Sequence, residues 1–165
     1  HCIPIDPLFL SWKLRSLNYT ARFIDLASEI NTNMPRYVVG KIQDVLNEME
    51  LPLKNSKVLI LGAAYKPDID DLRESPALDV IGLLQQKGAI VSYHDPYIPK
   101  IDDEGFSISS VEDLMQAVRS VDCVAIITNH SQYDYQEIFQ NAKCIMDARN
   151  ALAEIGKDDP KVTRL

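Results

Sequence analysis

The sequence predicts an α/β protein, with a Rossmann-like parallel sheet domain at residues 53–165 and a long helical region before it at residues 1–52. Its 165 residues are enough for one packed domain with an appended segment. In the first region the apolar residues recur at steps of three and four, which is the period of a helix. In the second, short apolar runs alternate with helical segments, which is typical of a parallel sheet with helices on both faces.

The first region is expected to hold a short helix that ends near Asn18 and a long helix that Thr20 caps. The long helix carries one apolar stripe, made of Phe23, Ile24, Ala27, Ile30, Met34, Val38, Ile42, Val45, Leu46 and Met49. Pro35 lies in the stripe and should kink the helix, because proline lacks an N–H and crowds the preceding turn. About 30 residues make a rod of about 45 Å, longer than a small domain needs. We therefore expect a subunit interface, and the alternative is a helix laid across its own core.

The second region is expected to contain four strands and three helices. The strands are predicted at residues 57–61, 89–93, 123–128 and 142–146. The helices are predicted at residues 76–87, 111–119 and 135–139. Gly62 bounds the first strand, Pro76 suits a first helical turn, Gly88 ends that helix, and Ser110 is expected to cap the next one.

Composition excludes several classes of protein. With 17 basic against 24 acidic residues, the chain has too few cations for nonspecific binding of nucleic acid. No run approaches the roughly 20 apolar residues that span a bilayer. Three cysteines, odd in number and far apart, predict no disulfide framework and indicate a reducing, cytoplasmic compartment. The histidines and cysteines lack zinc spacing, so no metal site is expected.

The ligand edge of the predicted sheet is its carboxyl edge, where ligands bind in open parallel sheets. The loop after the first strand, residues 62–75, has one glycine where a dinucleotide fingerprint has three. NAD is therefore not expected to lie across this turn in the usual way.

Cationic side chains gather at the same edge. Lys66 and Arg73 lie in the first loop together with Tyr65, and Arg149 follows the last strand. Two arginines and a lysine that converge on one crevice suit a diphosphate, since the guanidinium presents a planar fork to phosphate oxygens. The alternative is that Arg73 pairs with Asp70 or Asp71 and that all are solvated loop charges. His94 and His130 also lie at strand ends.

Cys2, with Asp6 four residues later, is a candidate for an activated thiolate, although most lone cysteines are inert. The other two cysteines, Cys123 and Cys144, fall in apolar strands and are expected in the core. The chain begins at His1 without an initiator methionine or a signal-peptide pattern, which we interpret as the start of a piece of something longer.

Three motifs carry a resemblance to a known family. They are His-Cys-Ile-Pro-Ile-Asp-Pro at residues 1–7, Tyr-Lys-Pro-Asp-Ile-Asp-Asp-Leu-Arg-Glu-Ser-Pro at residues 65–76, and Asp-Ala-Arg at residues 147–149. In order and spacing they resemble the UDP-glucose/GDP-mannose dehydrogenase family over nearly the whole chain. The long helix lies where that family has its central dimerisation helix. The resemblance therefore implies a homodimer formed through this helix.

The resemblance also implies roles for single residues. Cys2 matches the family's catalytic cysteine, and Asp6 the aspartate that assists the water and proton steps. Lys66 matches a substrate-binding lysine, beside which Tyr65 is a further substrate-binding candidate. Arg73 matches an arginine that reaches NAD. Arg149 matches an arginine that contacts the UDP-sugar, often from the dimer partner, and Ala148 replaces the glycine before it.

The implied enzyme has an NAD-binding domain, the linking helix and a UDP-binding domain, and this chain resembles the last two parts. NAD would be bound mainly by the part that is missing, so we expect the chain alone to be inactive. The implied reaction is a four-electron oxidation of a sugar C6 alcohol to a carboxylate with two NAD. The Cys2 thiolate would form a thiohemiacetal and then a thioester, which water would release.

The His-Cys-Ile-Pro form resembles the branch of the family that acts on UDP-N-acetylhexosamines and feeds capsule and O-antigen polysaccharide synthesis. Within it we favour UDP-N-acetylglucosamine over the mannosamine epimer. One alternative is a stand-alone nucleotide-sugar-binding or oligomerisation module without chemistry. Another is a flavodoxin-like mononucleotide binder, although the loop after the first strand lacks a Ser/Thr/Gly-rich phosphate site.

Overall fold

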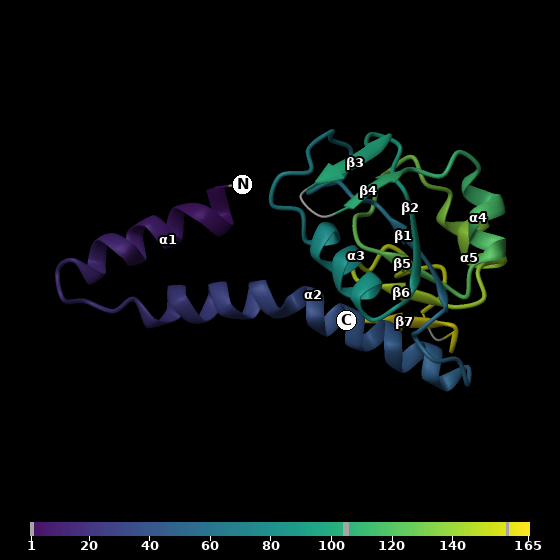
Figure 1. The fold of residues 1–165 in the computed structure, drawn as a ribbon, viewed down its shortest axis with the longest axis horizontal. Helices are drawn as coiled ribbons and strands as arrows, with labels where there is room; N and C mark the ends of the chain where they lie inside the picture. Colours follow the sequence, from purple (N-terminus) through teal and green to yellow (C-terminus); the bar gives the residue numbers. More distant parts are fainter. Residues whose placement is uncertain (1, 104–105, 158) are drawn as a thin grey trace.

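The computed structural model describes residues 2–103, 106–157 and 159–165 and confirms the α/β architecture (Figure 1). Two helices, α1 (Cys2–Arg15) and α2 (Arg22–Glu48), come before a five-stranded parallel sheet. In spatial order its strands are β2 (Ile90–His94), β1 (Lys57–Leu61), β5 (Cys123–Ile126), β6 (Ile145–Asp147) and β7 (Val162–Arg164). The chain thus moves outward in one direction from β1 to β2 and in the other from β1 to β5.

The two faces of the sheet are covered by different helices, because successive side chains of a strand point to opposite faces. Val58 and Ile60 of β1 pack with α2 and with α3 (Pro76–Gln86). Leu59 and Leu61 pack with α4 (Leu114–Ser120) and α5 (Tyr135–Asn141). Burial on both faces explains why β1 and β5 read as continuous apolar runs.

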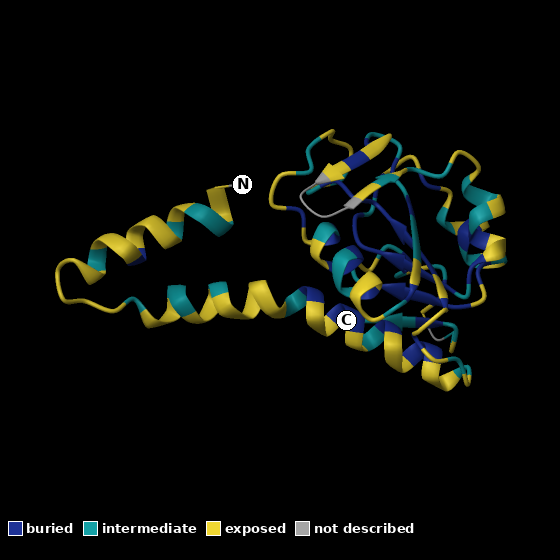
Figure 2. Cartoon of the chain, viewed as in Figure 1, coloured by how far each residue is buried: buried dark blue, intermediate teal, exposed yellow. Residues whose placement is uncertain are grey.

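Helix α2 is continuous over 27 residues with Pro35 inside it, and its ribbon changes direction part-way along (Figure 1). Its second half is docked on the sheet domain, where Val38, Ile42 and Leu46 are buried. Its first half extends away from the domain with α1 packed beside it, and both are largely exposed (Figure 2). The helix is therefore only partly laid across its own core.

Two predicted helix caps were wrong. Ala21, not Thr20, is the N-cap of α2 and makes no side-chain capping bond, and Asp25 in the first turn supplies the favourable negative charge instead. Ser110 does not cap α4, because its hydroxyl accepts from the Asp95 amide at 3.2 Å. Asp113 takes that place and accepts from Gln116 N at 2.8 Å.

Other boundaries also differ from the prediction. Helix α1 begins at Cys2 and ends at Arg15, three residues before Asn18. Helix α5 continues to Asn141, and Ala142 N closes it by donating to Ile138 O, so β6 begins at Ile145 rather than at residue 142. Pro76 does begin α3, and Ser75 caps it.

The sequence analysis missed three short strands. Strand β7 is only three residues long, and β3 (Lys100–Asp103) pairs antiparallel with β4 (Phe106–Ser109) in a separate small sheet. Strand β3 reads Lys-Ile-Asp-Asp, which lacks the apolar run or the β-branched alternation that identifies a strand.

Within the described ranges, no helix is both long enough and apolar enough to cross a membrane. The same residues contain no group of three or more His, Cys, Asp or Glu side chains placed to hold a metal ion.

Candidate functional site

The loop after β1 leaves the sheet at the point where the strand order reverses, between β2 and β5. Ligands of open parallel sheets bind in the crevice at such a switch point. Gly62 begins the loop with φ +80, and a Cβ there would lie 2.2 Å from the Thr128 carbonyl oxygen. Only glycine fits this turn, so the chain path into the loop is set by close contact between the ends of β1 and β5.

Asp95, at the end of β2, holds the loop from one side. Its buried carboxylate accepts hydrogen bonds of 2.7 to 3.1 Å from four backbone amides, those of Ala63, Ala64, Tyr97 and Ile98. In a dinucleotide-binding loop the amides after the first strand would face a phosphate. Here Asp95 occupies the amides of Ala63 and Ala64, so the loop does not fit the pyrophosphate of NAD.

His130, after β5, holds the loop from the other side. Its fully buried ring lies 2.9 Å through Nε2 from Asp95 Oδ2, and its Nδ1 accepts from Asp68 N at 3.0 Å. The Asp68 carboxylate accepts in turn from Ser131 N at 2.8 Å, and this hydrogen bond lowers the pKa of Asp68. Burial alone would raise the pKa of Asp95, but the hydrogen bonds from His130 and the backbone amides outweigh burial and lower it.

The sequence analysis placed His130 at a strand end but assigned it no role, and it passed over Asp95 and Asp68. The sequence did contain a signal for this pair, since Asp95 and His130 each follow a strand that flanks β1. Their use depends on contacts between residues 35 apart in the chain.

The predicted cations have separate partners. Arg73 forms a two-point pair with Asp71, with Nε 3.0 Å from Oδ1 and Nη2 2.8 Å from Oδ2, and its side chain is 79% exposed. These hydrogen bonds lower the pKa of Asp71 to about 2. The Lys66 ammonium lies 5.7 Å from the centre of the Tyr65 ring. For Arg73, the pairing within the loop that we considered as an alternative is therefore present.

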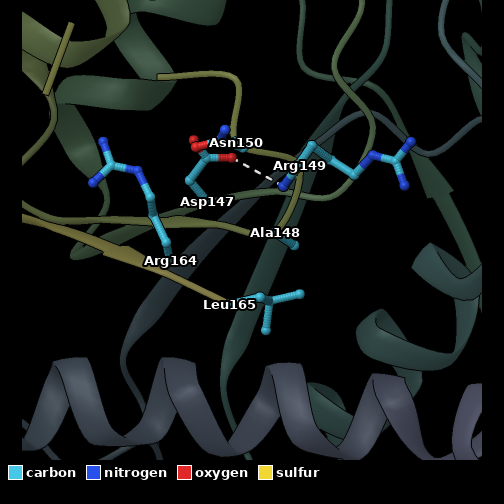
Figure 3. A pocket seen from close by; sticks show the side chains of 6 residues that line it. All are labelled: Asp147, Ala148, Arg149, Asn150, Arg164 and Leu165. Carbon is cyan, nitrogen blue, oxygen red and sulfur yellow. Dashed lines mark hydrogen bonds between the residues drawn. The ribbon is translucent and has the colours of Figure 1, made fainter. Parts of the chain in front are cut away.

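Arg149 lies at the end of β6 beside a cavity of about 290 Å³, which is lined by Asp147, Ala148, Arg149, Asn150, Arg164 and Leu165. Figure 3 shows the side chains of Arg149 and Arg164 extending in opposite directions from the Asp147 carboxylate. Asp147 accepts from the Arg149 amide at 3.0 Å, and the Arg149 Nε lies 3.5 Å from Asn129 Oδ1. The lining does not include Tyr65, Lys66 or Arg73, so these residues share the carboxyl edge with Arg149 but not this cavity.

Cys2 and Asp6 are exposed on α1, and their spacing of four residues puts them on one face of the helix. Helix α1 is attached to α2, where Ser11 Oγ donates to Asp25 Oδ1 at 2.6 Å and Arg15 pairs with the same carboxylate at 2.9 Å. Figure 1 shows α1 standing apart from the sheet. The chain thus keeps the Cys2–Asp6 pair separate from the strand-end residues. His1 lies outside the described residues.

The strand-end loops lie within a segment that matches a known protein family. Residues 59–154 match the model described as "UDP-glucose/GDP-mannose dehydrogenase family, UDP binding domain", which is more than half of the chain. The chain belongs to this family. The match contains Tyr65, Lys66, Arg73 and Arg149, whereas Cys2 and Asp6 lie outside it.

Members of this family from archaea and bacteria are similar to nearly the whole chain. A UDP-N-acetyl-D-mannosamine dehydrogenase from Methanococcus maripaludis (strain C7) is 34% identical over 160 residues, which cover 92% of this chain and 35% of that protein. One from Campylobacter jejuni is 35% identical over 136 residues, 81% of this chain and 32% of the relative.

Solved structures of family members share the fold. A UDP-D-ManNAc dehydrogenase from Pyrococcus horikoshii superposes with a TM-score of 0.78 at 28% identity, over 93% of this chain and 35% of the other. A UDP-N-acetyl-mannosamine dehydrogenase from S. aureus gives 0.69 at 30% identity, over 87% and 34%. The chain spans about a third of the length of the relatives it matches.

Proposed function

We propose that this chain is the UDP-binding and dimerisation part of an NAD-dependent UDP-N-acetylhexosamine 6-dehydrogenase. The observation that carries the proposal is the match of a UDP-binding domain to residues 59–154, which include the loops at the ends of β1, β2, β5 and β6. A crevice at this edge is where an open parallel sheet binds a nucleotide.

Arg149 is the residue that we assign to the UDP diphosphate. Its side chain is exposed at the cavity beside β6. Arg164 borders the same cavity, but its guanidinium donates to the carbonyls of Leu152, Gly156 and Lys157 and so stabilises the C-terminal turn. The exposed guanidinium of Arg149 presents a planar fork of N–H donors, which suits phosphate oxygens. Lys66 and Tyr65, on the β1 loop, are assigned to the sugar-nucleotide as well.

For the sugar we now propose N-acetylmannosamine. The His-Cys-Ile-Pro motif resembles the N-acetylhexosamine branch, within which we first favoured the glucosamine epimer. Relatives that are 33–35% identical over most of this chain are named UDP-N-acetyl-D-mannosamine dehydrogenases, and these names favour the mannosamine epimer.

Cys2 and Asp6 are the residues that we assign to the chemistry. A cysteine thiolate is strongly nucleophilic toward a sugar aldehyde and leaves readily from a thioester. The carboxylate of Asp6, one turn further along α1, would orient or deprotonate the water that releases the acid. Arg73 matches an arginine that reaches NAD in the family, and it is the residue of this chain that we assign toward NAD.

The dimer proposal is supported by apolar side chains that the single chain leaves uncovered. Phe23 on α2 is 88% exposed and Trp12 on α1 is 70% exposed, and Phe9, Leu10, Leu26 and Ile30 are also exposed on these helices. Apolar surface of this extent on a helical hairpin marks an interaction site. A second copy of the chain that packs against α1 and α2 would cover it.

The first experiment is a calorimetric titration of the chain with UDP. We expect binding, and we expect Arg149→Ala to weaken it by about tenfold or more, since a charge-assisted hydrogen bond contributes about 1.5–3 kcal/mol. Arg119→Ala is the matched control, because Arg119 lies in the last turn of α4 and bonds Asn141. If the folded chain did not bind UDP, or if both variants bound as the unaltered chain does, the assignment of Arg149 would be wrong.

A second experiment separates the enzyme fragment from a stand-alone binding module. The chain is mixed with UDP-N-acetylmannosamine and NAD, and NADH is followed by absorbance. We expect no NADH from the chain alone. When the same assay is run on a chain extended upstream of His1, NADH production that Cys2→Ala abolishes would support the dehydrogenase, and binding without chemistry would support the module.

A further inference from the structure

Asp68, in the middle of the β1 loop, has a strained backbone that two contacts hold in place. Its φ is +62, in the left-handed region that costs energy for a residue with a side chain. Its amide donates to His130 Nδ1 at 3.0 Å, and its carboxylate accepts from Ser131 N at 2.8 Å. The segment after β5 therefore holds both the backbone and the side chain of Asp68.

The hydrogen bonds define the proton state of His130. Because Asp68 N–H donates to Nδ1, this nitrogen carries no proton. Nε2 must then carry the proton of the neutral ring and donate it to Asp95 Oδ2 at 2.9 Å. One buried imidazole thus joins the end of β2 to the loop that follows β1, using both of its nitrogens.

The loop that His130 binds is short, and a hydrogen bond joins its two ends. Tyr65 N donates to Asp71 O at 2.8 Å, so residues 65–71 form a loop closed at its base. Lys66 and Asp68 both lie within it. A displacement of Asp68 would therefore move the Lys66 backbone relative to the sheet edge.

We propose that His130 is a positioning residue for the nucleotide-sugar site, whose neutral imidazole holds Asp68 and through it the 65–71 segment that carries Lys66. This inference rests on the proposed function of the loop in binding the UDP-sugar. His130 acts through Asp68 and does not touch the ligand.

A role in packing alone would not account for the arrangement. The His130 ring is tilted against the Tyr97 ring, with centroids 5.1 Å apart, and meets the Tyr133 ring edge-on at 5.7 Å. An apolar side chain could fill that space. Packing requires neither an acceptor at Nδ1 nor a donor at Nε2. Both are present, and both bond groups from other segments of the chain.

Two substitutions distinguish the roles of the two ring nitrogens of His130. His130→Gln can keep a donor near the position of Nε2, and so the bond to Asp95, but removes the acceptor for Asp68. His130→Asn can keep an acceptor near the position of Nδ1, and so the bond to Asp68, but removes the bond to Asp95. His94→Gln is the matched control, because His94 ends the neighbouring strand β2 and its imidazole contacts the Tyr133 hydroxyl, whereas only its backbone carbonyl meets the loop, at Gly62 N.

The readouts are amide hydrogen exchange of residues 65–71 and the Kd for UDP and UDP-N-acetylmannosamine. In His130→Gln we expect the amide exchange rates of Asp68 and Tyr65 to rise by about tenfold. The Kd for UDP-N-acetylmannosamine should also rise by about tenfold, because one hydrogen bond is lost. His130→Asn should stay within about threefold of the unaltered chain in both measurements, and His94→Gln should leave the loop exchange unchanged. Amides of β1 report whether each variant keeps its core.

Unchanged loop exchange in His130→Gln would overturn the proposal, as would equal loosening in both His130 variants that extended to the β1 amides. If the unaltered chain did not bind either nucleotide, the proposed function would fail, and the exchange data alone would then decide whether His130 positions the loop. Binding that persists at full strength in His130→Gln would overturn the inference and leave the proposed function standing.

Discussion

The Asp95 carboxylate and the His130 imidazole meet at 2.9 Å inside the domain, although they follow strands that lie on opposite sides of β1. Asp95 also binds the amides of Ala63 and Ala64, and His130 binds the amide of Asp68. The pair therefore ties both strand ends to the loop between them. Asp95 thus holds the start of the loop, and His130 holds its middle through Asp68.

Asp95→Asn should lower the free energy of unfolding by about 3 kcal/mol, because an amide NH₂ would face backbone N–H donors and the buried network would lose its charge. Urea denaturation measures the change. Asp102→Asn is the control, since Asp102 forms an exposed pair with Lys100 and should change stability by less than about 0.5 kcal/mol. Equal urea midpoints for the two variants would contradict the prediction.

Stability should fall as the pH is lowered, in two steps. Burial lowers the pKa of His94 below its ordinary 6.5, so the unfolded chain takes up the proton first and the folded state loses stability as pH falls below about 6.5. The pKa of Asp95 is lowered from 3.8, so the stability contributed by its ionised form is present above that pH and is lost below it.

Urea titrations between pH 7.5 and pH 3 test both steps. In His94→Gln the decline between pH 7 and pH 5 should be smaller, while the decline below pH 4 should remain. A stability that rose on acidification would show that the signs assigned to these groups are wrong.

Gly62→Ala should destabilise the chain by about 3 kcal/mol or more, since the added Cβ would lie 2.2 Å from a backbone oxygen at a positive φ. Gly82→Ala is a matched control in α3, where a Cβ would meet nothing within 4 Å. Alanine there should stabilise the helix by about 0.5–1 kcal/mol. Thermal unfolding followed by circular dichroism compares the two, and a similar loss in both would refute the explanation from the Gly62 turn.

Two isoleucines of α2 test whether its second half stabilises the domain and its first half forms the dimer. Ile42→Ala should cost about 3 kcal/mol, because Ile42 is fully buried against the sheet. Ile30 is 53% exposed, so Ile30→Ala should change the stability of the single chain little but weaken self-association. Urea denaturation and sedimentation over a range of concentrations distinguish the effects. A chain that sediments as a monomer at all concentrations would contradict the proposed dimer.

Sequence reasoning succeeded where a local pattern has one physical solution. The runs at β1 and β5 are apolar because both faces of the sheet are covered there. These two strands and β2 were found within two residues of their observed ends. Pro76 begins α3 as predicted, because its fixed φ suits a first helical turn. Strands β3 and β7 were missed because their pairing, rather than their composition, makes them strands. Ser110 was assigned wrongly because a distant amide takes its hydroxyl.

By itself the sequence determined the α/β class, the long helix and the position of its proline, and the motifs that place the chain in its family, since periodicity and motif spacing are properties of neighbouring residues. Only the tertiary structure decided that Asp95 binds the amides of the β1 loop, that His130 holds Asp68, that Arg73 is paired with Asp71, and that Arg149 borders a separate cavity. The contacts of Asp95 and His130 join residues more than 30 positions apart, and the cavity draws on β6 and β7. The order of the parallel strands brings these segments together at one edge, and it becomes defined only when the sheet has assembled.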